Sequence, residues 1–328
     1  MFDRFLKNPI DFIGHLKIYL LIPLVIFSTG IAVALLFGVK QDIDFSGGTL
    51  LEYSYTGKID TGEAEAAVKE AIDIPFTLDE KESFTQADEF YLTVSLTKKT
   101  ALAVDQMDAI TAALTEKFPE NNLKMAQQNS VDPTVGASLF GKALFTLLLA
   151  TIFVTIYVGI RFRKIGGISA GVFAMFALVH DMIFSFFVFV FFRIPLDMNF
   201  IAVLLTILGY SLNDTIVIYD RIREEKAKHG SKFSLRELTN DSINKTLGRT
   251  LNTAFATFFA ILTVCIVAYL YGLSSIISFA LPMSLGVIAG SFSTVCLVGP
   301  LWVHWEEYRA KHKQIKGKGT KKANSKKR

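Results

Sequence analysis

Six long runs of apolar residues divide the 328-residue chain and restrict the folds that it can adopt. A helix needs about 20 apolar residues to cross the hydrocarbon core of a bilayer, where the backbone polar groups must bond to one another. The runs predict transmembrane helices at residues 18–39, 143–160, 168–192, 198–219, 250–271 and 276–303. The first run is longer than the apolar core of a signal peptide and no small-residue cleavage site follows it, so we expect it to be retained as a span. A hydrophobic content of 51% agrees with a membrane protein and argues against a soluble one.

Lysine and arginine are distributed unevenly among the segments that connect these runs. Of the 34 basic residues, 24 lie before the first span, after the second, after the fourth or after the sixth, which all fall on one side of the membrane. Residues 40–142 instead carry 9 Lys/Arg and 18 Asp/Glu. The positive-inside rule therefore predicts that the arm at 1–17 and the basic tail at 304–328 are cytoplasmic. The tail has the charge to contact anionic lipid headgroups, with an acidic partner or a ribosome as the alternative.

Residues 40–137 contain no span and predict one extracytoplasmic domain, while residues 138–303 supply spans two to six. Strand-like alternation at 49–56, 76–84, 89–96 and 122–129 is interleaved with helical spacing at 61–72 and 104–118. This β-α-β-β-α-β order is that of a ferredoxin-like α+β sandwich. The segment has no His, no Cys and no Ser/His/Asp set, so we expect it to bind or to move rather than to catalyse.

Ionisable side chains lie inside two of the predicted spans. His180 and Asp181 are near the middle of the third, and Asn213 and Asp214 are near the end of the fourth. Ser211 lies three residues before Asp214 and therefore on the same helical face. A charge at the centre of a bilayer costs about 2.5–3.5 kcal/mol on insertion scales, so such groups usually serve a function. Burial and a nearby cation act in opposite directions on a carboxyl pKa, and an aspartate subject to both can load and release a proton near neutral pH.

Simpler interpretations of these residues stay open. An intramembrane Asp214, or the pair His180 and Asp181, could bond to a neighbouring helix and only fix its packing. Arg249 opens the fifth span and by itself is an ordinary positive-inside residue.

The remaining residues with chemical potential give no sign of an enzyme. The two cysteines, Cys265 and Cys296, lie in apolar runs and predict buried thiols rather than a disulfide or a metal site. The glycine pairs 47–48 and 166–167 lack the Lys-Ser/Thr of a phosphate-binding loop. We therefore expect no nucleotide chemistry in this chain.

Four segments carry a more specific signal. They read GYSLNDTIVIYDRIRE at 209–224, DIDFSGG at 42–48, HD at 180–181 and TLGRTLNT at 246–253. Together they resemble the SecF family of bacterial protein-export subunits, which is related to the resistance-nodulation-division transporters. The resemblance extends over about residues 5–305, and the segment in span four is its most specific part.

The resemblance implies a function and a set of site residues. It implies half of a twelve-span bundle of the resistance-nodulation-division type, completed by a separate SecD subunit beside the SecYEG channel in the bacterial inner membrane. Such a subunit is not an enzyme and needs no cofactor; it uses the proton gradient to assist an unfolded polypeptide across the membrane, and its partners include lipid but no nucleic acid. The coupling ion is H⁺, with Na⁺ left open. The implied proton relay is Asp214 and Arg249; polar support within the membrane would come from His180, Asp181, Asn213 and Ser211; a tight turn or hinge would lie at Gly47 and Gly48.

Two other functions compete with this hypothesis. An exporter of small molecules or lipids would usually carry two large external domains in one chain, whereas this sequence predicts one of modest size. A purely structural assembly factor would need neither Asp214 nor Arg249 for anything but packing.

Overall fold

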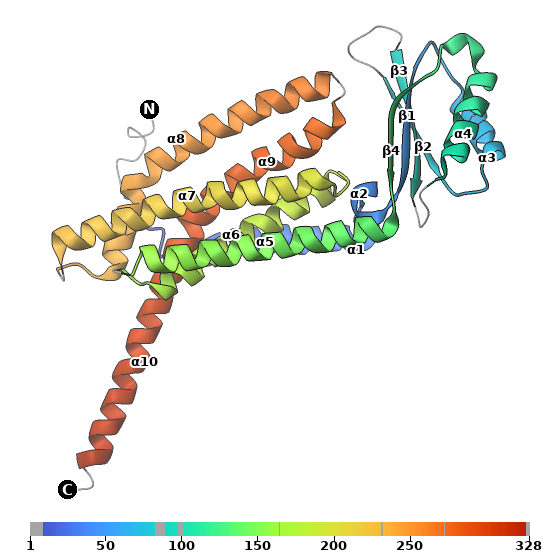
Figure 1. The fold of residues 1–328 in the computed structure, drawn as a ribbon. Helices are drawn as coiled ribbons and strands as arrows, with labels where there is room; N and C mark the ends of the chain where they lie inside the picture. Colours follow the sequence, from blue (N-terminus) through green and yellow to red (C-terminus); the bar gives the residue numbers. More distant parts are fainter. Residues whose placement is uncertain are drawn as a thin grey trace.

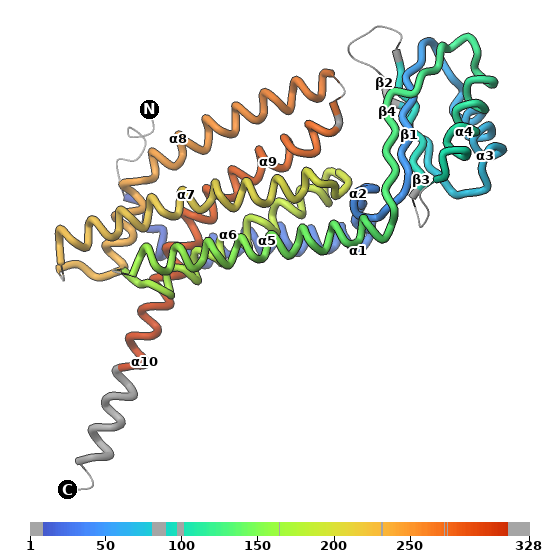
Figure 2. The backbone as a smooth tube through the Cα atoms, viewed as in Figure 1, coloured from blue at the N-terminus to red at the C-terminus, as the bar shows by residue number. Residues whose placement is uncertain are grey.

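The computed structural model describes residues 9–82, 89–97, 102–163, 165–230, 232–271 and 273–325. Within them, six helices are long and apolar enough to cross a membrane. These helices form a bundle, and a small α+β domain is attached to one end of it (Figure 1). The last helix leaves the bundle at the opposite end and projects away from it (Figure 2). The predicted fold class, a polytopic helical membrane protein with one ferredoxin-like domain, is confirmed.

Three of the long helices, α5, α7 and α8, extend well beyond the apolar runs that predicted them. Their bounds are α1 Leu16–Phe37, α5 Pro133–Arg161, α6 Ile168–Phe191, α7 Met198–His229, α8 Leu235–Leu270 and α9 Ser274–Ser293. A π-helical segment, Thr294–Val298, joins α9 to α10, Gly299–Ser325. Hydropathy marks only the part of a helix that suits lipid, whereas the helix itself continues until its backbone is capped or broken.

Helices α5 and α7 show why a helix can extend beyond its apolar run. Helix α5 begins at Pro133 rather than at residue 143, because Asp132 accepts a hydrogen bond from the Thr134 amide and proline suits the first helical turn. Helix α7 continues to His229 rather than ending at residue 219. Its polar end has ion pairs between residues three and four apart, such as Arg221–Glu224 and Glu224–Lys228, both at 2.8 Å, which favour a helix.

The α+β domain has a four-stranded antiparallel sheet with the strand order β2-β3-β1-β4. The strands are β1 Gly48–Thr56, β2 Thr77–Glu82, β3 Glu89–Thr97 and β4 Lys124–Val131. Helices α3 Thr61–Ala71 and α4 Val104–Lys117 lie on one face of this sheet, and the short helix α2 Ile43–Ser46 and the 3₁₀ turn η2 Pro119–Asn121 complete the domain (Figure 1). The alternating residues Leu51, Tyr53 and Tyr55 of β1 are buried against Val68 of α3 and Ile110 of α4.

Two glycines form the joint between the domain and the bundle. Gly47 has φ 71° and ψ 163°, a backbone conformation that is essentially restricted to glycine, and Gly48 has φ 137°. A Cβ atom at Gly47 would lie 2.3 Å from the Cα of Pro133, and one at Gly48 would lie 2.3 Å from the carbonyl oxygen of Leu96. The positive φ angles and these close approaches explain why glycine suits both positions, with the start of α5 packed directly against Gly47.

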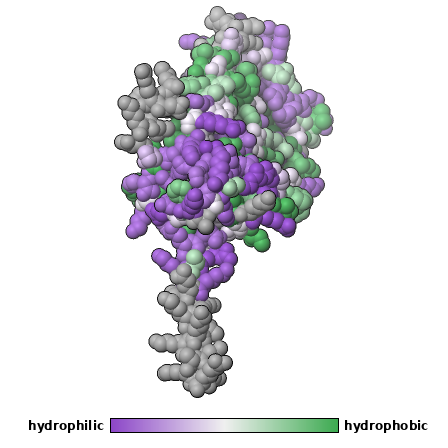
Figure 3. Space-filling view, turned by 90° about the vertical axis from the view of Figure 1, so that its left-hand side faces the viewer, coloured by the Kyte–Doolittle hydropathy of each residue, from purple (hydrophilic) through white to green (hydrophobic). Residues whose placement is uncertain are grey.

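The opposite end of the bundle is polar. Hydrophilic side chains gather on the face that is turned away from the α+β domain (Figure 3). Beneath it, an aromatic cluster of Phe162, Tyr219 and Trp302 closes the apolar core, and Phe12 and Ile13 of the segment before α1 are buried in the same cluster.

Candidate functional site

A buried carboxylate joins three helices in the middle of the bundle. Asp181 of α6 is fully buried, and its two oxygens have different partners. Oδ1 lies 2.8 Å from Nδ1 of the adjacent His180. Oδ2 accepts hydrogen bonds from the hydroxyls of Ser211 on α7 at 2.5 Å and Ser293 at the end of α9 at 2.9 Å. Because a buried carboxylate is costly without partners, this set explains how Asp181 is accommodated.

Asp214 lies one turn further along α7, on the same face as Ser211. Its side chain is only 3% exposed. Among the described residues, the hydrogen bond to its carboxylate comes from Ser291 of α9 and is long, with 3.5 Å between Oγ and Oδ2. The hydroxyl of Tyr210 lies close to Ser291 and Thr257 but has no hydrogen bond of normal geometry within the described chain. Asp214 is thus buried like Asp181 but held by far fewer polar contacts.

Arg249 is brought near Asp214 without forming an ion pair with it. The guanidinium of Arg249 lies in the neighbourhood of the Asp214 carboxyl, but the two are not within 4.0 Å of each other in the described chain. Arg249 and Asn213 are both exposed on the outside of the bundle. Of the residues predicted from the sequence, the structure therefore gathers His180, Asp181, Ser211 and Asp214 into one polar cluster, with Arg249 at its edge and Asn213 outside it.

Helix α9 supplies the side of this cluster that the sequence analysis missed. Ser291 and Ser293 reach Asp214 and Asp181, and Thr294 lies 3.3 Å from the Thr215 hydroxyl of α7. Thr294 also begins the π-helical segment, an irregularity that often occurs at functional sites.

Two glycines allow α9 to come this close. A Cβ atom at Gly286 would lie 2.1 Å from Cδ1 of Ile207, and one at Gly290 would lie 3.3 Å from Cβ of Ser211. The spacing Gly286-x-x-x-Gly290 is a helix-packing signal that could have identified this face of α9 from the sequence.

Other predicted features have simpler outcomes. Cys265 and Cys296 are free thiols, and both are partly rather than fully buried. Within the part of the chain that the structure describes, no three His, Cys, Asp or Glu side chains come together as a metal site would require. What the cluster can do chemically is to hold and exchange a proton on a carboxylate within the membrane.

Comparison with known proteins places these features in a family. The family described as "Protein export membrane protein SecD/SecF, C-terminal" matches residues 110–308. The protein translocase subunit SecF of Calditerrivibrio nitroreducens is 33% identical over 303 residues, covering 92% of this chain and 96% of the relative. The subunit of the same name from Synechocystis is 32% identical over 276 residues, covering 83% of this chain and 84% of the relative.

Solved structures agree with the sequence relatives. A crystal structure of SecDF, a translocon-associated membrane protein from Thermus thermophilus, superposes with a TM-score of 0.73 at 27% identity, covering 92% of this chain and 39% of that one. SecDF in a super-membrane-facing form superposes with a TM-score of 0.65 at 26% identity, covering 95% of this chain and 40% of that one. This chain thus spans about two fifths of the length of the SecDF chains.

Proposed function

Because the chain belongs to the SecD/SecF family of protein-export membrane proteins, we propose that it is the SecF subunit of a bacterial protein translocase. It acts as a transport accessory rather than as an enzyme. The similarity to the SecDF structures supports SecD as its partner. We place both termini in the cytoplasm, the α+β domain outside it, and the complex beside the SecYEG channel, where it assists an unfolded polypeptide.

The proposal extends to the energy source, which is the proton gradient. The observation that carries it is the contrast between the two buried carboxylates. Asp181 is held by His180 and two hydroxyls, whereas Asp214 has, within the described chain, a single long hydrogen bond from Ser291. A carboxylate so sparsely bonded can accept and lose a proton without breaking a hydrogen-bond network. When Asp214 loses its proton, the positive charge of Arg249 on α8 attracts the carboxylate.

The base of the α+β domain provides a physical route from Asp214 to the domain. The amide of Met198, the first residue of α7, donates to Asp44 of α2 at 3.3 Å. Backbone hydrogen bonds of 3.0 Å join Asp42 to Leu196 and Leu196 to Lys40. A displacement of α7 is therefore passed directly to α2 and to the turn at Gly47 and Gly48.

The available energy is sufficient for such a movement. One elementary charge that crosses a potential of about 100 mV releases about 2.3 kcal/mol. Since about 1.4 kcal/mol corresponds to a tenfold change in an equilibrium constant, one proton can shift a two-state equilibrium well over tenfold.

The test replaces Asp214 with Asn in the full chain, co-expressed with its SecD subunit, and measures export into inverted membrane vesicles with and without a proton gradient. We expect Asp214→Asn to lose the gradient-dependent part of export. The control Thr206→Val changes an exposed polar side chain on the same helix and should retain gradient-dependent export. Replacing the proton gradient with a sodium gradient in the wild type decides between H⁺ and Na⁺.

Co-purification with SecD distinguishes the two remaining outcomes. If Asp214→Asn assembles normally and retains gradient-dependent export, the protein is an assembly factor and the proton relay is refuted. If the variant no longer assembles, Asp214→Glu tests the same carboxyl chemistry with the charge retained.

A further inference from the structure

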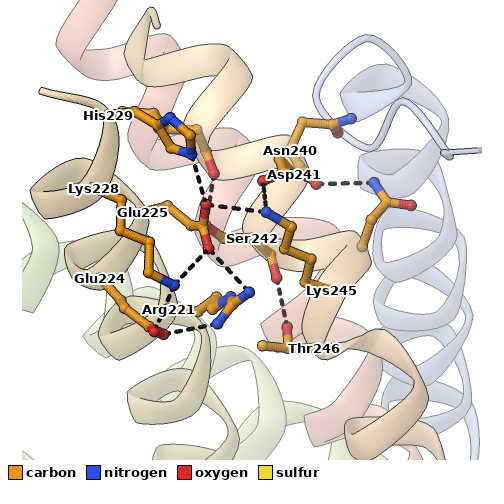
Figure 4. Close-up of polar contacts among 12 residues, drawn as sticks. Arg221, Glu224, Glu225, Lys228, His229, Asn240, Asp241, Ser242, Lys245 and Thr246 are labelled. Carbon is orange, nitrogen blue, oxygen red and sulfur yellow. Dashed lines mark hydrogen bonds and ion pairs between the residues drawn. The ribbon is translucent and has the colours of Figure 1, made fainter. Parts of the chain in front are cut away.

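Charged side chains surround the buried carboxylate of Glu225 (Figure 4), near the end of α7 that faces away from the α+β domain (Figure 1). The carboxylate of Glu225 is only 2% exposed. From its own helix it is approached by Arg221 at 3.0 Å, His229 at 3.4 Å and Lys228 at 3.8 Å. The segment DRIRE, residues 220–224, ends immediately before Glu225. Its sequence alone suggests an ordinary solvated helix end.

One contact in the cluster crosses between helices. Nζ of Lys245 on α8 lies 3.0 Å from Oε2 of Glu225. The same amine lies 2.6 Å from Asp241 on its own helix, which directs it toward α7 (Figure 4). The Lys245 side chain is 39% exposed, so the pair is partly solvated and its effect is to tie this point of α8 to α7.

The positions of these residues relate the cluster to Asp214 by helix geometry. Glu225 follows Asp214 by 11 residues, which is about three turns and returns to the same face of α7. Arg249 follows Lys245 by four residues, or about one turn, on the same face of α8. The contact of Lys245 with Glu225 therefore lies on the same faces of α7 and α8 as Asp214 and Arg249, about one turn of α8 from Arg249 and about three turns of α7 from Asp214.

The distribution of buried side chains along α8 shows why the contact between Lys245 and Glu225, called the anchor below, affects the position of Arg249. Its buried side chains are concentrated in the first half of the helix: Leu238, Thr239, Ser242, Ile243, Thr246, Leu247 and Thr250. Beyond Thr250, among the described residues of α8, only Ala254 and Ala268 are buried. Arg249 thus sits where the firmly packed part of the helix ends.

We propose that Glu225 and Lys245 are positioning residues, whose ion pair sets the register of α8 against α7 and so determines how closely Arg249 approaches Asp214. The role rests on the proposed function, because it matters for export only if Asp214 exchanges the coupling proton. The pair itself lies outside the apolar part of both helices and takes no part in proton transfer.

The experiment compares two lysines that contact the same carboxylate from different helices. Lys245→Met removes the contact from α8, while the matched control Lys228→Met removes one from α7 itself. Lys245→Arg keeps the charge and should rescue. Each variant is made in the full chain with its SecD subunit, and gradient-dependent export is measured across a range of pH.

Lys245→Met should reduce gradient-dependent export roughly fivefold or more. It should also move the midpoint of the pH profile upward, because a carboxyl without a nearby cation holds its proton to higher pH. Lys228→Met and Lys245→Arg should leave gradient-dependent export and the midpoint of its pH profile close to those of the wild type. Equal effects of Lys245→Met and Lys228→Met on the pH profile would overturn the proposal.

A distance measurement tests the anchor independently of export. Spin labels at Ala227→Cys on α7 and Ala256→Cys on α8, in a background with Cys265 and Cys296 replaced by Ala, report the separation of the helices. Lys245→Met should change or broaden the distance distribution, and an unchanged distribution would overturn the anchor. If wild-type export does not depend on the proton gradient, the proposed function is wrong. The distance between the two spin labels still shows whether Lys245 fixes the position of α8 against α7.

Discussion

The hydroxyl of Ser211 on α7 donates to the carboxylate of Asp181 on α6 across 2.5 Å, one helical turn away from Asp214. This bond ties the helix that carries Asp214 to a neighbour in the bundle. Together with the bond from Ser293 of α9 it makes Asp181 the meeting point of three helices. The two intramembrane aspartates thus have different environments although they are close in the fold.

We predict that Ser211→Ala destabilises the protein by about 1–3 kcal/mol, because it removes a buried hydrogen bond to a carboxylate. The control is Ser185→Ala, since Ser185 is equally buried on α6 but its hydroxyl donates to the backbone carbonyl of Asp181 within the same helix. Thermal unfolding in detergent should show the larger loss for Ser211→Ala. Equal losses would mean that the bond between the helices contributes nothing beyond its burial.

The turn at Gly47 allows a test in which backbone strain and steric contact are separated. Gly38 has φ 70° and ψ 172° with nothing within 4 Å of an added Cβ, whereas Gly47 has a similar conformation against Pro133. Alanine at either position should cost about 1–3 kcal/mol of backbone strain. Gly47→Ala should cost more than Gly38→Ala because α5 must move as well, which unfolding midpoints would measure. An equal cost at both positions would show that the joint has room to adjust.

The cap of α5 predicts a dependence of stability on pH. Hydrogen bonds from the Thr134 hydroxyl and amide hold the pKa of Asp132 below its ordinary value. A folded-state pKa below the unfolded one means that the cap contributes fully at pH above the unfolded value and is lost as pH falls through the folded one. Asp132→Asn retains a capping side chain that does not titrate. The usual pKa of Asp is about 3.9, so the cap is weakened at about pH 3. Thermal unfolding midpoints measured at pH 6 and at about pH 3 should therefore differ less for Asp132→Asn than for the wild type.

The architecture was largely predictable because it depends on local patterns. Apolar run length predicts the spans, and alternation of period two or 3.6 predicts the strands and helices of the α+β domain. Helix ends were less predictable, as Pro133 and the polar end of α7 show, because capping and ion pairs extend a helix beyond its apolar part.

The candidate site was predictable only where a residue was unusual for its surroundings. Asp181 and Asp214 stand out as charges in apolar runs, whereas Ser291 and Ser293 are ordinary residues whose contacts depend on how α9 packs. Glu225 was missed for the same reason, since its contact with Lys245 depends on how α8 packs against α7. The proton relay of Asp214 and Arg249 and the hinge role of Gly47 and Gly48 stay predictions.

The segment before α1 is held on α8 by two asparagines one turn apart. The amide side chain of Asn244 pairs with both the N–H and the carbonyl of Ile10, each at 2.9 Å. Asn240 accepts from the amide of Phe12 and donates to the carbonyl of Ile10, also at 2.9 Å. Because Phe12 and Ile13 are buried in the aromatic cluster, this segment is packed into the fold rather than lying free on its surface.

We predict that Asn244→Ala releases this segment locally without unfolding the bundle. The loss of two hydrogen bonds, at about 0.5–1.5 kcal/mol each, should increase amide exchange at Ile10 and Phe12 by about tenfold. Asn252→Ala, on the exposed side of the same helix, is the control and should leave this exchange unchanged. Hydrogen exchange followed by mass spectrometry on the peptide that contains residues 9–14 measures the effect. If Asn244→Ala leaves the exchange as it is, the burial of Phe12 and Ile13 alone holds the segment, and the asparagines only satisfy a backbone that the aromatic cluster has already placed.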